Sequence, residues 1–195
     1  MTEETTKPAP LVTQAIRDGN VELLERLFSS FPEMVGFNMP SFGSWLHYAA
    51  AYGSSDVIEY LIEQGFDVNS RAARDDRQPI VFACNENHPE FAKILLDHDA
   101  KLDVSTSVGN PLFGAIVGRS PDCARLLIDA GIDTRASYIL EGELQIRSDA
   151  IAFAMLRGET EIANMIALHN ADGDDGKARE LVAEGDRIAE LRTAA

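Results

Sequence analysis

The sequence predicts an all-α protein in which helix-turn-helix units, joined by hairpin-like loops, stack into a solenoid. Three observations lead to this fold class: two short apolar frames that alternate along the chain, polar breaks between them, and a nearly constant spacing. Each frame spans only two to three helical turns, which is marginal for an isolated helix in water. A weak unit of this kind buries its apolar face against the next copy, so repetition predicts stacking.

The first frame consists of an apolar residue followed three positions later by alanine. It begins at Val12, Leu46, Ile80, Leu112 and Ile151, which gives spacings of 34, 34, 32 and 39 residues. A second frame follows each first frame by about 11 to 15 residues, in segments that contain Leu23, Val57, Phe91, Cys123 and Ile162. Both frames have helical spacing, so we expect two helices in each unit.

Polar breaks separate the two helices of each unit, at residues 19–20, 53–56, 87–90, 119–122 and 158–161. Glycine and asparagine tolerate the left-handed conformation that ends a helix. Pro89 and Pro121 suit the first turn of the helix that follows, where a missing N–H costs nothing. Stretches rich in Gly, Asp and Asn, such as 64–69 and 130–134, predict turns between units.

These units resemble the ankyrin repeat, which has a period of about 33 residues and the signature Thr-Pro-Leu-His-x-Ala. The segment Ser44–Ala49 matches that signature with Trp in place of Pro. The segments Gln78–Ala83 and Asn110–Ala115 keep the Pro and lose the His, whereas Asp149–Ala154 keeps only the apolar skeleton. The resemblance implies that His47 ties its own hairpin by hydrogen bonds.

The resemblance covers residues 11–172 and implies five repeats, at about 11–36, 37–70, 71–104, 105–136 and 137–172. The first unit lacks the signature, as expected of an N-terminal cap. We expect residues 1–10 to form a flexible tail. Residues 173–195 are expected to form an acidic linker and a degenerate capping repeat, because 182–186 echoes 16–20 and a terminal repeat needs a polar face.

The charge of the chain argues against direct binding of nucleic acid or anionic membranes. Its 195 residues hold 17 Lys and Arg against 32 Asp and Glu, a net charge of −15. No apolar run approaches the roughly 18 residues that span a bilayer. We therefore expect a cytoplasmic protein that is a monomer when free. Cys84 and Cys123 are expected to be core residues in separate repeats, with no disulfide between them.

The sequence offers little for catalysis. Its four histidines lack the spacing of a zinc site, and the segment around Lys177 lacks the serine or threonine of a phosphate-binding loop. The acidic run at 172–176 lacks the pattern of a calcium loop. We therefore expect no metal, no cofactor and no catalytic residue, and an enzyme is the remote alternative.

The family resemblance implies a protein partner that docks on the concave side, at the hairpin tips and the ends of the first helices. Carried over by position, the candidate partner-binding residues are Phe42, Trp45, Tyr52, Arg74, Asp75, Asn85, Glu86, Tyr138, Glu141, Glu143 and Arg157. Aromatic side chains are frequent interface anchors. The alternative for Phe42 and Trp45 is that they staple the hairpin to the stack.

Within the class of binding modules, the acidic chain resembles the ankyrin-type immunity proteins of bacteria. That resemblance implies a basic toxin as the partner, because opposite charge speeds association. A general adaptor or regulatory subunit is the alternative.

Overall fold

The computed structural model describes residues 8–139 and 147–193. The chain divides into two compact units. Unit 1 contains the residues up to Phe82 together with 90–100, and unit 2 contains 83–89 and the residues from Lys101 onward. The described ranges contain eleven α-helices and one two-stranded sheet, which confirms the predicted all-α class.

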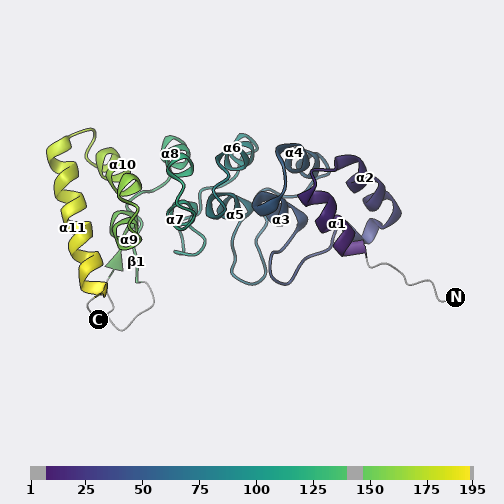
Figure 1. Cartoon of the computed structure of the whole chain (residues 1–195), viewed down its shortest axis with the longest axis horizontal. Coiled ribbons are helices and arrows are strands. Elements are labelled where there is room, and N and C mark those ends of the chain that lie inside the picture. Colours follow the sequence, from purple (N-terminus) through teal and green to yellow (C-terminus); the bar gives the residue numbers. More distant parts are fainter. Residues whose placement is uncertain (1–7, 140–146, 194–195) are drawn as a thin grey trace. The chain divides into compact units, whose positions relative to one another are not determined.

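Unit 1 is built from successive antiparallel helix pairs. Its elements are α1 (Pro8–Arg17), α2 (Val21–Ser30), the short 3-10 helix η1 (Pro32–Met34), α3 (Trp45–Tyr52), α4 (Ser55–Glu63), most of α5 (Pro79–Asn85) and α6 (Pro89–Asp97). Helix α1 packs on α2 and α3, and α4 packs on α3 and α2 (Figure 1). The frame residues Val12, Leu46, Val57 and Ile80 have no exposed surface, so the predicted apolar frames form the core.

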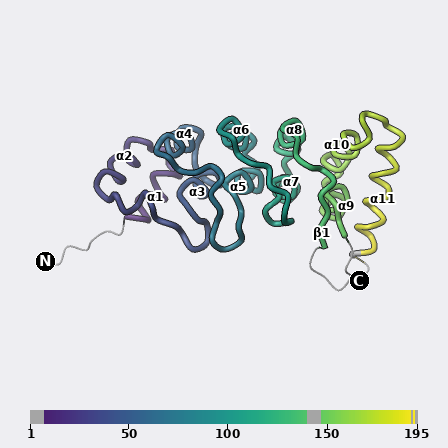
Figure 2. Tube along the Cα trace, turned by 180° about the vertical axis from the view of Figure 1, so that it is seen from behind, coloured from purple at the N-terminus to yellow at the C-terminus, as the bar shows by residue number. Residues whose placement is uncertain are grey.

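Unit 2 continues the pattern and ends in a long helix. Its elements are α7 (Pro111–Val117), α8 (Pro121–Asp129), β1 (Tyr138–Ile139), β2 (Arg147–Ser148), α9 (Ala150–Leu156), α10 (Thr160–Asn170) and α11 (Asp175–Thr193). The strands pair antiparallel, with Tyr138 opposite Ser148. Helix α9 packs on α7 and α10, and α11 covers both α9 and α10 (Figure 2).

The breaks between paired helices have the conformation that the sequence predicts. The first residue of four of the five breaks is left-handed: Gly19, Asn87, Arg119 and Gly158 have φ between 54° and 76°. Helices α6 and α8 begin at Pro89 and Pro121, as expected. Side chains of Asn20, Ser54 and Ser120 accept hydrogen bonds from the first turn of the next helix, which satisfies its free N–H groups.

Both ends of the chain differ from the sequence prediction. Helix α1 already begins at Pro8, so residues 8–10 are helical rather than part of a flexible tail. The expected linker and helix-turn-helix cap is instead one continuous helix from Asp175. Gly185 does not end a helix: a Cβ at this position would lie 2.8 Å from Ile151 Cγ2, so glycine permits the close packing of α11 on α9.

The two cysteines are core residues, as predicted. Cys84 in α5 and Cys123 in α8 have no exposed surface, and both belong to unit 2. They lie in different helix pairs, and both are free thiols. The neighbouring Cys123 side chain and burial raise the pKa of the Cys84 thiol well above its ordinary value.

Candidate functional site

A cluster of aromatic rings lies at the end of α3 in unit 1. The half-buried Phe42 packs edge-on against Tyr48 and Tyr52, with ring centroids 5.2 and 5.6 Å apart, and it also contacts Phe82 at 5.6 Å. Tyr48 and Tyr52 are four residues apart, so they lie on one side of the helix and pack against each other at 5.2 Å. Tyr52 keeps 37% of its surface exposed.

Arg17, the last residue of α1, fixes two of these rings. Its Nε donates a hydrogen bond to Tyr48 Oη at 2.6 Å. Its guanidinium carbon lies 5.6 Å from the centroid of the Tyr48 ring and 5.4 Å from that of Tyr52, within cation–π range. We call Arg17, Phe42, Tyr48, Tyr52 and Phe82 the aromatic face. Each of its side chains contacts at least one other member of the group.

Trp45 does not belong to the aromatic face, although the sequence made it a candidate anchor. It is fully buried, its Nε1 donates to the carbonyl of Met34 at 2.6 Å, and its ring stacks on Phe37 at 5.4 Å. A residue without exposed surface offers no contact area to a partner. Trp45 therefore staples the 34–44 segment to the helices, which was the alternative interpretation.

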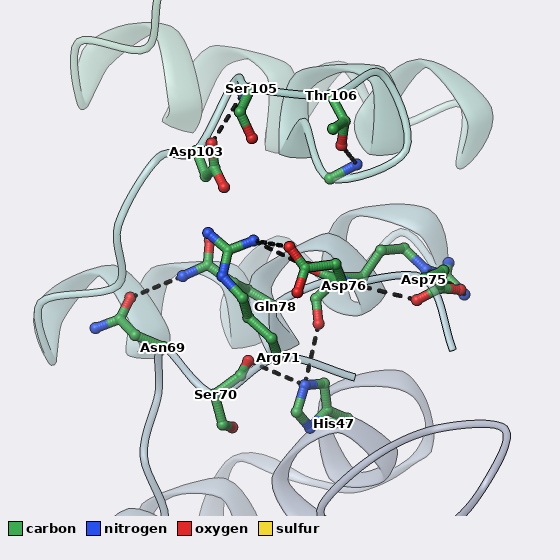
Figure 3. A network of polar contacts seen from close by, with 12 residues as sticks. His47, Asn69, Ser70, Arg71, Asp75, Asp76, Gln78, Asp103, Ser105 and Thr106 are labelled. Atoms are coloured by element: carbon green, nitrogen blue, oxygen red, sulfur yellow. Dashed lines mark hydrogen bonds and ion pairs between the residues drawn. The ribbon is translucent and has the colours of Figure 1, made fainter. Parts of the chain in front are cut away.

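His47 forms the hydrogen bonds that the resemblance implies, but beyond Ser44 of its own segment it ties the loop that joins the second and third repeats (Figure 3). Its Nε2 donates to the carbonyls of Ser70 and Arg77, both at 3.1 Å, because both partners are acceptors. Its Nδ1 then accepts from the backbone N–H of Ser44 at 3.1 Å. Burial lowers the pKa of His47 and outweighs the opposing effect of these hydrogen bonds, so the imidazole is held in its neutral form.

The loop at residues 70–78 holds three arginines close to two carboxylates. Arg71 pairs with Asp76 at 2.6 Å, and Arg77 pairs with Asp75 at 2.8 Å while lying 4.2 Å from the Phe82 ring centroid. Burial acts to raise the pKa of Asp75, but the hydrogen bonds and charge of Arg77 prevail and leave it lowered. Arg74 is exposed, and its positive charge also acts to lower the pKa of Asp75. Its exposed side chain can reach an external acceptor.

Unit 2 contains an open groove of about 610 Å³ between two successive connecting loops. Residues 104–107 form one wall, and residues 136–139 with Asp133 and Arg147 form the other. The first wall is shaped by short-range hydrogen bonds, from the Ser105 N–H to Asp103 and from the Gly109 N–H to Thr106 (Figure 3). The groove is lined by hydroxyl groups, one carboxylate and one guanidinium.

Tyr138 forms part of this groove and joins its two walls. Its hydroxyl donates to the carbonyl of Val104 at 2.6 Å and accepts from Asn110 Nδ2 at 3.0 Å. Its ring packs edge-on against Phe113 at 5.1 Å. Burial raises the pKa of Tyr138, and the nearby charges of Asp133 and Asp103 add to this increase, whereas the Asn110 hydrogen bond opposes it. The residue is thus a structural tie with only part of its surface accessible.

The remaining predicted site residues lie in unit 2 or outside the described residues. Asn85 is half-buried at the end of α5, Glu86 follows it on the surface, and Arg157 is exposed after α9. Glu141 and Glu143 lie outside the described residues. Sequence reasoning left Tyr48 and Phe82 out of the site. The four-residue spacing of Tyr48 and Tyr52, behind the basic end of α1, was the signal that could have found the cluster.

Acidic residues are unevenly distributed between the two helices of a repeat. The first helices α1, α3, α5, α7 and α9 contain no Asp or Glu, and Arg17 is their one charged side chain. The second helix α4, in contrast, carries Asp56, Glu59 and Glu63. The negative charge of unit 1 is therefore carried by its second helices and loops rather than by the aromatic face.

Residues 8–139 and 147–193 contain no cluster of three or more His, Cys, Asp or Glu side chains that could hold a metal ion. Within the same ranges, no helix is long and apolar enough to cross a membrane.

The family model for ankyrin repeats (3 copies) matches residues 2–72 and 46–138, well over half of the chain. The chain therefore belongs to the ankyrin-repeat family. Repeat proteins of this kind present extended surfaces to partners, and the chain is a protein-interaction module.

Similar proteins are mostly much longer. An ankyrin repeat and KH domain-containing protein of Caenorhabditis briggsae is 25% identical over 149 residues, which cover 74% of this chain and 6% of the relative. A probable E3 ubiquitin-protein ligase of Oryza sativa subsp. japonica is 28% identical over 122 residues, which cover 60% of this chain and 24% of the relative. NF-kappa-B inhibitor cactus of Drosophila melanogaster is 32% identical over 62 residues, which cover 32% of this chain and 12% of the relative. The chain spans less than a quarter of the length of each.

Proposed function

We propose that the chain binds a protein partner through the aromatic face of unit 1, with Tyr52 as the central contact. The observation that carries this proposal is that Tyr52 is exposed while its ring is held by Phe42 and Arg17. Tyrosine is enriched at binding hot spots, because a rigid ring supplies a large contact area at a low entropic cost. A ring that is ordered before binding lowers that cost further.

Arg74 supplies a second contact in this proposal. An exposed guanidinium matches a carboxylate or a carbonyl of the bound protein. Asp75 is held by Arg77 and keeps the loop in place, so its contribution is to position Arg74. The proposed contacts in unit 2 are Asn85, Glu86, Tyr138 and Arg157, and those outside the described residues are Glu141 and Glu143.

The partner is a basic protein in this proposal, and the chain is its inhibitor in the cytoplasm, where it is a monomer when free. The net charge of −15 supports a basic partner, because long-range attraction speeds the encounter. The acidic second helices provide that attraction, and the aromatic face provides the short-range anchor. The name of the cactus relative, an inhibitor of another protein, supports inhibition. A toxin is the basic partner that the immunity-type resemblance suggests.

A general adaptor that positions another protein is the second candidate. The E3 ubiquitin-protein ligase relative favours it, because there the matching region is a small part of a longer protein. The two candidates differ in what happens to the partner. An inhibitor abolishes the activity of its partner in an equimolar complex, whereas an adaptor leaves that activity intact.

The test compares binding of a captured partner by Tyr52→Ala and by Glu63→Ala, a control at the exposed end of α4. We expect Tyr52→Ala to cost about 2 kcal/mol of binding free energy, or about 30-fold in Kd, with only a small fall in melting temperature from the lost ring contacts with Phe42 and Tyr48. Glu63→Ala should lower the association rate slightly and raise the Kd only by that same small factor, because it removes one charge from the long-range attraction. Titration calorimetry measures the first quantity, and stopped-flow mixing at two salt concentrations measures the second.

The reverse result would show that the binding face is wrongly assigned. A large loss of affinity from Glu63→Ala, together with an unaffected Tyr52→Ala variant, would place the partner on the second helices. An association rate that does not change with salt would exclude electrostatic attraction to a basic partner.

A further inference from the structure

Arg17 gives the aromatic face of unit 1 a positive charge that the other first helices lack. It is the last residue of α1, which packs on α3, and its side chain is exposed (Figure 1). The helices α1, α3, α5, α7 and α9 contain no Asp or Glu, and no other Lys or Arg. In a chain with a net charge of −15, this guanidinium is therefore a local exception.

The guanidinium of Arg17 is held by aromatic rings and not by a carboxylate. Its Nε donates to Tyr48 Oη at 2.6 Å, and its central carbon lies 5.4 Å from the centroid of the Tyr52 ring. The adjacent carboxylate of Asp18 instead accepts a hydrogen bond from Gln14 at 2.8 Å. Within residues 8–139 and 147–193, Arg17 forms no ion pair, and the N–H groups of its two Nη atoms have no acceptor.

Tyr48 supplies a second donor beside this guanidinium. Its oxygen accepts the bond from Arg17, so the hydroxyl can still donate its own proton. The residue is only 6% exposed, and no group in the described part of the chain accepts that proton. An oxygen of a bound molecule that accepts it removes the cost of leaving a mostly buried donor unused.

We propose that Arg17 and Tyr48 bind a carboxylate of the protein partner, from an Asp or Glu side chain that lies next to an apolar residue. This inference rests on the proposed function, because the apolar neighbour is the group that contacts Tyr52. The planar guanidinium fork matches the two oxygens of a carboxylate, and such charge-assisted bonds are stronger than neutral ones. A lysine or arginine of the partner accepts from neither donor and is repelled by Arg17.

A carboxylate contact agrees with a partner of basic net charge because the two effects act over different distances. The charge of −15 attracts a basic protein during the encounter, over distances up to a Debye length of about 8 to 10 Å. Arg17 acts only at hydrogen-bond distance, after the encounter. The partner that fits both is a basic protein with an acidic residue beside an exposed apolar one, and this pair fixes the orientation in which the partner docks.

The test uses peptides selected on the full chain from a random library displayed on phage. The library is first depleted on the Tyr52→Ala variant, so that the selected peptides depend on the aromatic face. Each selected peptide is synthesised, and each Asp is changed in turn to Asn and each Glu to Gln. A version with an amidated C-terminus separates a side-chain carboxylate from the terminal one. Fluorescence anisotropy then gives the Kd of every pair.

We expect one of these peptide changes to weaken binding to the wild-type chain about 10-fold, as the loss of a charge-assisted hydrogen bond does. The same change should have less than about a 2-fold effect on Arg17→Gln, because the carboxylate has then already lost its main partner. Tyr48→Phe should show an intermediate effect, since it removes one of the two donors. Arg17→Lys should bind the unchanged peptide more weakly than wild type, because it keeps the charge and loses the fork.

Arg26→Gln is the matched control. Arg26 is exposed on α2 and lies outside the aromatic face, so its loss changes the net charge equally. The peptide change should cost this variant as much as it costs wild type. If Arg17 only orders the rings, the peptide change will also cost Arg17→Gln as much as wild type, which a purely structural role predicts and which overturns this inference.

The remaining outcomes separate this inference from the proposed function. Peptides that depend on Tyr52 but need no carboxylate, need only the terminal carboxylate, or lose their carboxylate effect in Arg74→Gln instead of Arg17→Gln would overturn the inference and leave the proposed function standing. A library that yields no peptide dependent on Tyr52 would overturn both.

Discussion

The two units hold their connecting loops by different chemistry at equivalent positions. In unit 1, His47 of α3 bonds to two carbonyls of the following loop. In unit 2, the equivalent position in α7 is Phe113, whose ring packs against Tyr138 of its own following loop and stacks on Phe153 at 4.7 Å. The Tyr138 hydroxyl then supplies the polar bond, to Val104. A loop of this repeat can thus be held by a buried polar group or by aromatic area.

The difference between the two ties predicts opposite pH sensitivity. The imidazole of His47 must stay neutral to accept from Ser44, and burial lowers its pKa. The Tyr138 hydroxyl must stay protonated to donate to Val104, and burial raises its pKa. Acid should therefore weaken the tie in unit 1, and alkali the tie in unit 2.

The largest expected effect tests whether the two units share one core pattern. Leu46 in unit 1 and Leu112 in unit 2 occupy the same frame position and have no exposed surface. Leu46→Ala and Leu112→Ala should each lower the free energy of unfolding by about 2 to 5 kcal/mol, because each leaves a cavity. Denaturant melts measure this loss.

Leu168→Ala is the surface control, since Leu168 on α10 is 41% exposed, and it should cost less than about 1 kcal/mol. Losses of that small size at both Leu46 and Leu112 would contradict the repeat register. A large loss at one position alone would show that the two units do not depend equally on this frame.

The intermediate effect tests the polar tie by giving unit 1 the residue found in unit 2. In His47→Phe, the carbonyls of Ser70 and Arg77 lose their donor and the Ser44 N–H loses its acceptor. We expect a loss of about 1 to 3 kcal/mol at neutral pH, the usual cost of leaving buried polar groups unsatisfied. Urea melts at pH 7.5 and at lower pH values provide the measurement.

The acid dependence of wild type and His47→Phe should also differ. The unfolded imidazole has a pKa of about 6.5 and the folded one a lower pKa. As the pH falls below about 6.5, the unfolded state takes up the proton first, so wild type loses stability until the folded pKa is passed. His47→Phe lacks this component, and the other three histidines cancel in the comparison. Parallel acid profiles for the two proteins would contradict a neutral, buried His47.

The repeat frame could be predicted from sequence because it depends on local apolar spacing. Leu46, Ile80 and Leu112 recur at one position of a helical pattern, and each is buried. The left-handed residues at the breaks were visible for the same reason. The end of the chain was not predicted correctly. A glycine in a sequence suggests the end of a helix, but Gly185 lies inside α11, where its missing side chain lets the helix pack closely on Ile151.

The candidate site was only partly predictable because its contacts join distant residues. An aromatic residue near the start of a helix can either pack a loop onto the helices or bind a partner. The sequence alone does not show which of these roles Trp45 and Phe42 have. The contact of Arg17 with Tyr48 spans 31 positions and depends on how α1 packs on α3. The close approach of Gly118 at the end of α7 to the last turn of α5 likewise joins distant residues, since a Cβ there would lie 2.3 Å from the Cys84 carbonyl oxygen.

The smallest expected effect tests the aromatic tie of unit 2. Tyr138→Phe keeps the ring against Phe113 and removes one hydroxyl, so the carbonyl of Val104 loses its donor and Asn110 Nδ2 loses its acceptor. The groove side of this residue is partly open, and water can replace some of the lost bonding. We therefore expect a loss of only about 0.5 to 1.5 kcal/mol at neutral pH.

The alkaline profile is the sharper measurement. The unfolded tyrosine ionises at a pKa of about 10 and the folded one at a higher pKa, so wild type loses stability as the pH rises from about 10 toward the folded value. Tyr138→Phe should lose less over the same interval, and the difference between the two profiles cancels every other titrating group. Identical alkaline profiles would show that the hydroxyl is not held in its protonated form, and that aromatic packing alone holds this loop.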